Sequence, residues 1–266
     1  MLSLYLDDAG SSNSAGETVF VMGGCIATAQ QWEKFEIQWD AACREAGIKA
    51  FHPTDFFARK VEPFKSWPNK THAEFARRFA AIAETHFATG VGRGVDAAAF
   101  NRVVSPEQFV VRGFELFGVQ VKGFPALMFC ARTCMEWIGH WWPGRPKNEG
   151  IAVVLDDGPG VGAAIEYFRF MKKNDVPWSR PFRSFTTTEK AGLSPLQAAC
   201  YVAYETRLEL AARTKSPRPA PRPSFERLTQ RDRVSIRIAS ESGLTQYVEE
   251  LRRAWIVMQM EKELSC

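Results

Sequence analysis

Residues 150–157 read GIAVVLDD, an uninterrupted run of apolar residues that ends in two aspartates. Such a run is typical of a strand that is covered on both faces, as in the middle of an α/β sheet. Residues 2–8, LSLYLDD, form a second segment of this kind, in which apolar and polar residues alternate before two aspartates close it. The sequence therefore predicts an α/β domain in which two strands end in acidic pairs.

Further strands and helices are predicted on either side of these two segments. Apolar, β-branched residues at 18–28 indicate a second strand, antiparallel to the first, and FATGVGRGVDA, from Phe87, indicates a third. The segment at 150–157 is then the fourth strand, and residues 181–187 form the fifth. Helices are predicted over 30–46, 106–142, 163–173 and 194–213.

Two more segments carry helix signals. Thr71 followed by Glu74 matches a capping box, which predicts a helix from Thr71 to about His86. From Gly243 onward, the pattern of charged and apolar residues predicts an amphipathic helix.

The composition indicates a single water-soluble domain. The chain has 266 residues, of which 45% are hydrophobic and 24% charged, enough apolar material for a large core. No stretch approaches the roughly 20 apolar residues of a membrane span, and MLSLYLDD reaches two acids too early for a signal peptide. The six cysteines include no C-x-x-C pair, which favours free thiols. We therefore expect a cytoplasmic protein with no membrane partner.

The chain divides into a main domain and a basic C-terminal part. We expect the domain over residues 1–213, a proline-rich linker over 214–224, and a basic, helical extension over 225–266 that packs on the same domain. Between Arg213 and Arg237, eight basic residues stand against two acids, a local charge of +6, although the whole chain carries only +4. This stretch either attracts the phosphates of a nucleic acid or is a solvated surface.

The two acidic pairs, Asp7-Asp8 and Asp156-Asp157, suggest a metal site. Only alternate residues of a strand share a face, so one acid of each pair can point to a common site if the strands are neighbours. Because sites in α/β sheets gather at strand ends, Asp7 would then meet Asp156 or Asp157. Converging carboxylates repel each other unless a cation joins them, and hard oxygen ligands suit Mg²⁺ or Mn²⁺. Two such ions can hold a phosphodiester and activate water; alternatively, the acids only mark the exits from two strands.

Five short motifs follow one another along the chain: LYLDDAG at 4–10, GGCIAT at 23–28, FHPTDFF at 51–57, VVLDDGPGVG at 153–162 and SPLQAACYVAYE at 194–205. In this order they resemble domain-of-unknown-function family 3800, whose members look like ribonuclease H. The resemblance covers residues 2 to about 210. It implies functional positions at Asp7, Asp8, Gly10, His52, Asp55, Asp156, Asp157, Gln197, Tyr204 and Glu205.

Two positions depart from the family pattern. Ala9 replaces a serine, and Cys200 occupies the place where an aspartate of the late helix is expected. Gln197, Cys200 and Tyr204 share a face of that helix. Glu205 lies roughly 140° away from Cys200 and cannot simply replace the missing acid. A thiol is a poor ligand for Mg²⁺, so the site either uses the remaining aspartates or is weakened.

His52 and Asp55 lie in the FHPTDFF segment, and the resemblance implies that both line the site. His52 would then transfer a proton or contact a phosphate, and it is the candidate base if Cys200 acts as a nucleophile. Alternatively, Asp55 helps to cap a short helix after Pro53, and His52 is an ordinary surface residue. Basic residues around the segment could contact a nucleic-acid backbone, namely Lys49, Arg59, Lys60 and Lys65.

We expect a ribonuclease-H-like three-layer α/β domain with a mixed central β-sheet flanked by helices. The first functional hypothesis is a divalent-metal-dependent nuclease that hydrolyses phosphodiesters of RNA or DNA, with Asp7 and Asp156 as main ligands and Asp8, Asp157 and Asp55 in support. The second is a catalytically degenerate protein of the same fold that binds nucleic acid or another protein. Hydrolysis of a small nucleotide is a third hypothesis, and the sequence leaves the oligomeric state open.

Overall fold

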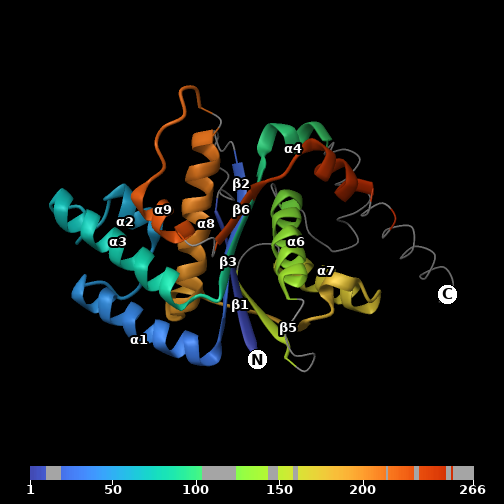
Figure 1. Ribbon diagram of the computed structural model, residues 1–266, viewed down its shortest axis with the longest axis horizontal. Coiled ribbons are helices and arrows are strands. Elements are labelled where there is room, and N and C mark those ends of the chain that lie inside the picture. Colours follow the sequence, from blue (N-terminus) through green and yellow to red (C-terminus); the bar gives the residue numbers. More distant parts are fainter. Residues whose placement is uncertain are drawn as a thin grey trace.

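The computed structural model describes residues 1–9, 19–103, 124–142, 149–157, 161–213, 215–230, 234–249 and 253. These residues form one six-stranded mixed β-sheet with helices packed against both of its faces (Figure 1). The expectation of an α/β domain with a mixed sheet between helices is therefore confirmed. Gly10, residues 106–123 of the predicted helical stretch, and most of the chain after residue 249 lie outside the described residues.

The strands lie in the order β5-β4-β1-β2-β3-β6. Strands β1, β2 and β3 form an antiparallel meander, while β4 runs parallel to β1, β5 parallel to β4, and β6 parallel to β3. The first five match the predicted strands, and the antiparallel pairing of the first two is confirmed. The edge strand β6 falls in the predicted helical extension and is not among the predicted strands. The bounds are Leu2–Ala9 for β1, Val19–Thr28 for β2, Thr89–Asp96 for β3, Ile151–Asp156 for β4, Phe182–Thr188 for β5 and Val234–Ile238 for β6.

The helices form two layers. One face of the sheet is covered by α1, α2, α3, α8 and α9, and the other by α4, α6 and α7 (Figure 1). A short 3₁₀ turn, η3, links β5 to α8, and residues 241–249 are helical. The bounds are Ala29–Glu45 for α1, Pro53–Ala58 for α2, Asn69–His86 for α3, Ala97–Val103 for α4, Phe124–Trp141 for α6, Val161–Lys173 for α7, Lys190–Gly192 for η3, Ser194–Arg213 for α8 and Pro223–Thr229 for α9.

The capping prediction at Thr71 is wrong. Helix α3 begins at Asn69 with Pro68 as its N-cap, and the Pro68 carbonyl already accepts the first helical hydrogen bond. Thr71 therefore lies inside the first turn and cannot cap it. A capping box is present instead at Thr28, whose hydroxyl accepts from the Gln31 backbone while the Gln31 side chain accepts from the Thr28 backbone.

Helices cover both faces of the sheet (Figure 1), and in β4 Ile151, Val153 and Leu155 are buried while the residues between them are half-buried. Leu4 and Leu6 point from β1 into a core shared with α6 and α7. On the other face, Trp39 and Tyr201 are fully buried in a second core made by α1, α3 and α8. Because the half-buried side of β4 carries Ala152 and Val154, its sequence is continuously apolar even though its burial alternates.

Helix α8 lies unusually close to the sheet because the strands beneath it carry glycines. A Cβ atom at Gly23 would lie 2.4 Å from the backbone nitrogen of Ala203, and one at Gly92 would lie 2.2 Å from the hydroxyl of Thr206. Gly23 is the antiparallel partner of Asp7. The close approach therefore brings the preceding turn of α8 over the end of β1, where Asp7 lies.

Two expectations from the composition can be compared with the structure. The five cysteines within the described ranges are free and buried: Cys25, Cys43, Cys130, Cys134 and Cys200. Within the same ranges, none of the helices combines the length and the apolar character needed to cross a membrane.

Candidate functional site

Asp7 and Asp156 come together at the carboxyl ends of two neighbouring parallel strands. Leu6 of β1 lies opposite Leu155 of β4, so the aspartates that follow them are side by side. Both leucines point into the core beneath α6 and α7, and both aspartates therefore point to the face that α8 covers. The structure thus joins one acid from each predicted pair.

Lys190 lies between these two carboxylates. Its Nζ atom is 2.7 Å from Oδ2 of Asp7 and 3.1 Å from Oδ2 of Asp156. Its backbone nitrogen also donates to Oδ1 of Asp156, at 2.9 Å. Lys190 begins the turn η3, which follows β5. The cluster is therefore built at the carboxyl ends of three parallel strands: β1 supplies Asp7, β4 supplies Asp156, and the turn after β5 supplies Lys190. We call Asp7, Asp156 and Lys190 the acid–lysine cluster.

Lys190 was not among the predicted site residues. The available signal was a basic residue three positions past the fifth predicted strand, which ends at residue 187, at the same sheet edge as the two acids. That signal needs the strand order to be interpreted, because Lys190 is remote from Asp7 along the chain.

Burial governs the electrostatics of the cluster. Asp7 is only 2% exposed, and burial raises the pKa of its carboxyl to about 6, against the opposing effect of Lys190. Burial alone would lower the pKa of Lys190, but its acidic neighbours, among them the carboxylates of Asp7 and Asp156, raise it above its ordinary range. The lysine therefore stays charged at neutral pH and acts as a built-in cation for the two aspartates.

Cys200 faces the cluster from α8. Its thiol lies within hydrogen-bonding reach of Asp7 and Lys190. Burial, followed by the charge of Asp7, raises the pKa of this thiol well above its usual value, so it remains protonated at neutral pH. A neutral buried thiol is a weak nucleophile, and the structure gives no support to the nucleophilic role considered for Cys200. It occupies the position that the resemblance assigns to a carboxylate.

Asp8 and Asp157 are not brought into the cluster. Strand alternation turns the side chain of Asp8 to the α6 face, where its charge acts on Cys130. The Asp8 backbone donates to Oδ1 of Asp7 at 2.8 Å, and the charge of Asp8 helps to raise the pKa of Asp7. Asp157 is exposed, and its backbone nitrogen donates to the carbonyl of Thr188. In this geometry neither side chain lies beside Asp7 and Asp156, where a metal ligand would have to be.

His52 and Asp55 form a pair of their own. Their side chains approach to 3.4 Å, and they are 44% and 48% exposed. Within the described residues, no hydrogen bond or ion pair joins either of them to Asp7 or Asp156. The short helix α2 does begin at Pro53 after His52, although no side chain caps it.

Gln197 is a buried structural link. Its Oε1 accepts from the Trp39 indole at 3.0 Å and from the Phe51 backbone at 2.8 Å. Its Nε2 donates to the carbonyl of Ala191, in the turn that carries Lys190. Gln197 therefore positions the FHPTDFF segment and η3 on α8, and its effect on the cluster is indirect.

Tyr204 and Glu205 contact the C-terminal part of the chain. The Tyr204 ring stacks on Phe57, with centroids 5.3 Å apart, and the guanidinium of Arg222 lies 3.9 Å from the Phe57 centroid. Glu205 is fully buried, accepts from the Ser224 hydroxyl at 2.8 Å and pairs with Arg222 at 3.5 Å. Because Glu205 points roughly 140° away from Cys200 around the helix, it does not complete the cluster.

Several arginines of the basic stretch are used inside the molecule. Arg213 and Arg218 both pair with Glu209, which is buried in α8. Arg227 lies 3.4 Å from Glu84, a buried residue of α3. Together with Glu205, these buried glutamates neutralise much of the charge that the local count assigns to a nucleic-acid surface.

The donor set fits a divalent cation only in part. Within the described residues, no group of three or more histidine, cysteine, aspartate and glutamate side chains is arranged to hold a metal. Asp7 and Asp156 could hold Mg²⁺ or Mn²⁺ if the Lys190 ammonium moved aside, with water and phosphate oxygens as the remaining ligands. A thiol at Cys200 adds little to such a site.

The chain matches no protein-family model, and no curated protein shows significant similarity to it. The resemblance to domain-of-unknown-function family 3800 therefore stays a prediction.

Proposed function

We propose that the chain is a ribonuclease-H-like phosphodiesterase centred on the acid–lysine cluster. One observation carries the proposal: Asp7 and Asp156, on adjacent parallel strands, converge on a single cation at the carboxyl ends of those strands. Ligand and catalytic sites of α/β sheets gather at that edge. A buried carboxyl with a strongly raised pKa in such a place is also a common mark of a functional site.

The sheet topology supports the ribonuclease-H-like assignment. The proposal requires the first and fourth strands to be neighbours, and β4 pairs directly with β1. It also requires the late helix to pass over the end of the first strand, where α8 brings Cys200 to Asp7. If the aspartates only marked the ends of two strands, neither the pairing of β1 with β4 nor the position of α8 would be required.

Asp7 and Asp156 would hold Mg²⁺ or Mn²⁺ when a phosphodiester of RNA or DNA enters. The metal would supply Lewis-acid polarisation of the phosphate and a more acidic bound water. Lys190 would then donate to a phosphate oxygen and stabilise its growing negative charge. In the absence of metal, the same ammonium keeps the two carboxylates from repelling each other.

A degenerate binding protein is the second candidate. The observation in its favour is that Lys190 already neutralises both aspartates, while Cys200 removes the third carboxylate that the resemblance expects. In that case the cluster only stabilises the sheet edge, and metal never replaces the lysine.

Calorimetric titration with Mn²⁺ distinguishes the two candidates. We expect the unaltered chain to bind Mn²⁺ and to cleave labelled RNA, DNA or an RNA–DNA hybrid in its presence, and Asp7→Asn to lose both properties. Asp157→Asn is the matched control, because it makes the same charge change on an exposed neighbour of the site. Failure of the unaltered chain to bind Mn²⁺, with or without a non-cleavable oligonucleotide, would favour the degenerate protein.

A further inference from the structure

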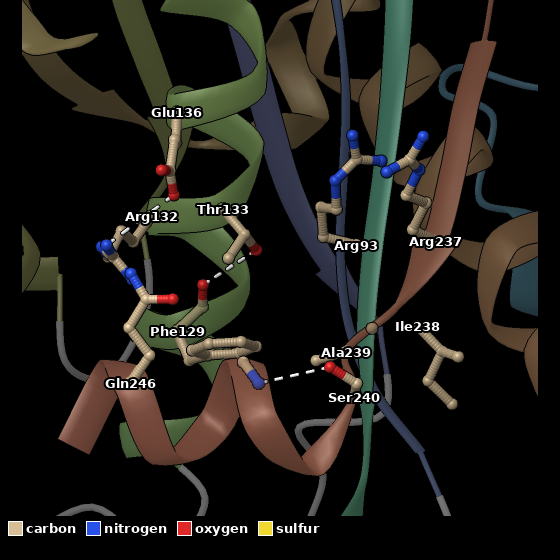
Figure 2. Close-up of a pocket in the computed structure, with 12 residues that line it drawn as sticks. Arg93, Phe129, Arg132, Thr133, Glu136, Arg237, Ile238, Ala239, Ser240 and Gln246 are labelled. Carbon is tan, nitrogen blue, oxygen red and sulfur yellow. Dashed lines mark hydrogen bonds and ion pairs between the residues drawn. The ribbon is translucent and has the colours of Figure 1, made fainter. Parts of the chain in front are cut away.

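A pocket of about 270 Å³ lies on the face of the sheet opposite to Asp7 (Figure 2). Its walls come from β3, β6, α6 and the first turn of the helix at 241–249. None of the residues considered for the acid–lysine cluster lines it. The lining residues that matter here are Arg93, Phe129, Arg132, Glu136, Arg237 and Gly243.

Two arginines lie side by side at one wall. Arg93 of β3 and Arg237 of β6 are direct partners in the parallel ladder, so their side chains leave the same face together (Figure 2). Arg93 is only 7% exposed. Its guanidinium donates to the carbonyls of Gly92 and Ser235, at 2.9 and 2.7 Å, and to the Ser235 hydroxyl at 3.2 Å. These neutral partners fix the group in place without cancelling its charge.

The pocket holds more positive charge than its own acid can balance. Arg132 of α6 forms a third guanidinium, and its Nη2 lies 3.7 Å from Glu136, the one acid among the lining residues. Within the described part of the chain, neither Arg93 nor Arg237 forms an ion pair with a carboxylate. Burial, and to a smaller extent the neighbouring Arg237, lowers the pKa of Arg93, as expected for a buried cation beside a second one.

We propose that this pocket binds a phosphate monoester. The charged lining residues carry a net charge of +2, which matches a dianion, and the adjacent guanidinium forks of Arg93 and Arg237 have the geometry that binds phosphate oxygens. The helix at 241–249 adds the positive end of its dipole, since its first turn, with Gly243, borders the pocket. The volume admits the phosphate together with part of the group that carries it.

Calorimetry in metal-free buffer with EDTA tests the proposal with three probes: inorganic phosphate, adenosine 5′-monophosphate and adenosine. We expect saturable binding of the phosphate-bearing probes and none of adenosine. Tighter binding of the nucleotide would identify an ester as the ligand, and equal binding would identify the phosphate alone. EDTA prevents a metal at Asp7 from recruiting phosphate, so failure here is separable from failure of the proposed nuclease function.

Arg237→Gln is the informative variant, because Arg237 is exposed and its loss leaves the core intact. Removing one charged fork should weaken phosphate binding by about tenfold or more. Arg180→Gln, at an exposed arginine paired with Asp175, is the control and should bind like the unaltered chain. Absence of saturable binding by the unaltered chain, or equal affinities in Arg237→Gln and the unaltered chain, would overturn the proposal.

Discussion

Replacing Lys190 by methionine tests the acid–lysine cluster most directly. Methionine keeps the unbranched shape of lysine but removes the ammonium 2.7 Å from Asp7 and 3.1 Å from Asp156. Asp7, at 2% exposure, would then be a buried carboxylate without its cation. Loss of one partner from a buried ion pair lowers the free energy of unfolding by about 3–5 kcal/mol, and we expect a loss of that order at pH 8.

The loss should shrink at acid pH. The folded-state pKa of Asp7, already raised to about 6, rises further when Lys190 is absent. A carboxyl whose folded-state pKa is raised destabilises the fold above that pKa and ceases to do so once it is protonated below it. At pH 5 Asp7 is largely protonated with or without Lys190, so the difference in free energy of unfolding between the two proteins should be clearly smaller than at pH 8.

Urea unfolding at both pH values, with and without Mn²⁺, measures these effects. If metal occupies the place of the ammonium, Mn²⁺ at 100 times its Kd should return roughly 2.7 kcal/mol of stability to Lys190→Met. Lys65→Met, at an exposed lysine, is the control and should change little. Equal stability of Lys190→Met and the unaltered chain at pH 8, together with no effect of Mn²⁺, would refute the reasoning.

Two further predictions concern α8. Cys200→Asp should supply a third carboxylate and raise Mn²⁺ affinity and the rate of cleavage by at least about tenfold, the effect of one charge-assisted contact. Calorimetry measures the affinity and a cleavage assay measures the rate. No gain in either would contradict the placement of Cys200 at the site. Gln197→Leu leaves the Trp39 indole and the Phe51 backbone without their shared acceptor, so we expect about 2–5 kcal/mol of destabilisation in urea unfolding. A change below about 1 kcal/mol would mean that water replaces Gln197 as their acceptor.

The fold was accessible from sequence wherever the information is local. Strands β1 and β4 are visible in the sequence as apolar segments closed by acids, and α1 and α8 correspond to the helices predicted over 30–46 and 194–213. Alternation also implied that only one acid of each pair could reach a common site. The preference for Asp156 over Asp157, already present among the predicted ligands, is explained by the register, which sets Leu6 opposite Leu155 and so places Asp156 beside Asp7.

The sequence by itself determined the class of the domain, most of its strands and the aspartates from which the site is built. These features depend on local patterns, namely the spacing of apolar residues and the residues that end each strand, which can be read within a short stretch of the chain. Only the tertiary structure decided what surrounds those aspartates. Lys190 reaches Asp7 because β5, β4 and β1 are adjacent in the sheet, and buried glutamates from α3 and α8 neutralise arginines that are distant in the chain. Strand β6 likewise places Arg237 beside Arg93. Charges act through space, so their effects depend on packing between segments that no local pattern connects.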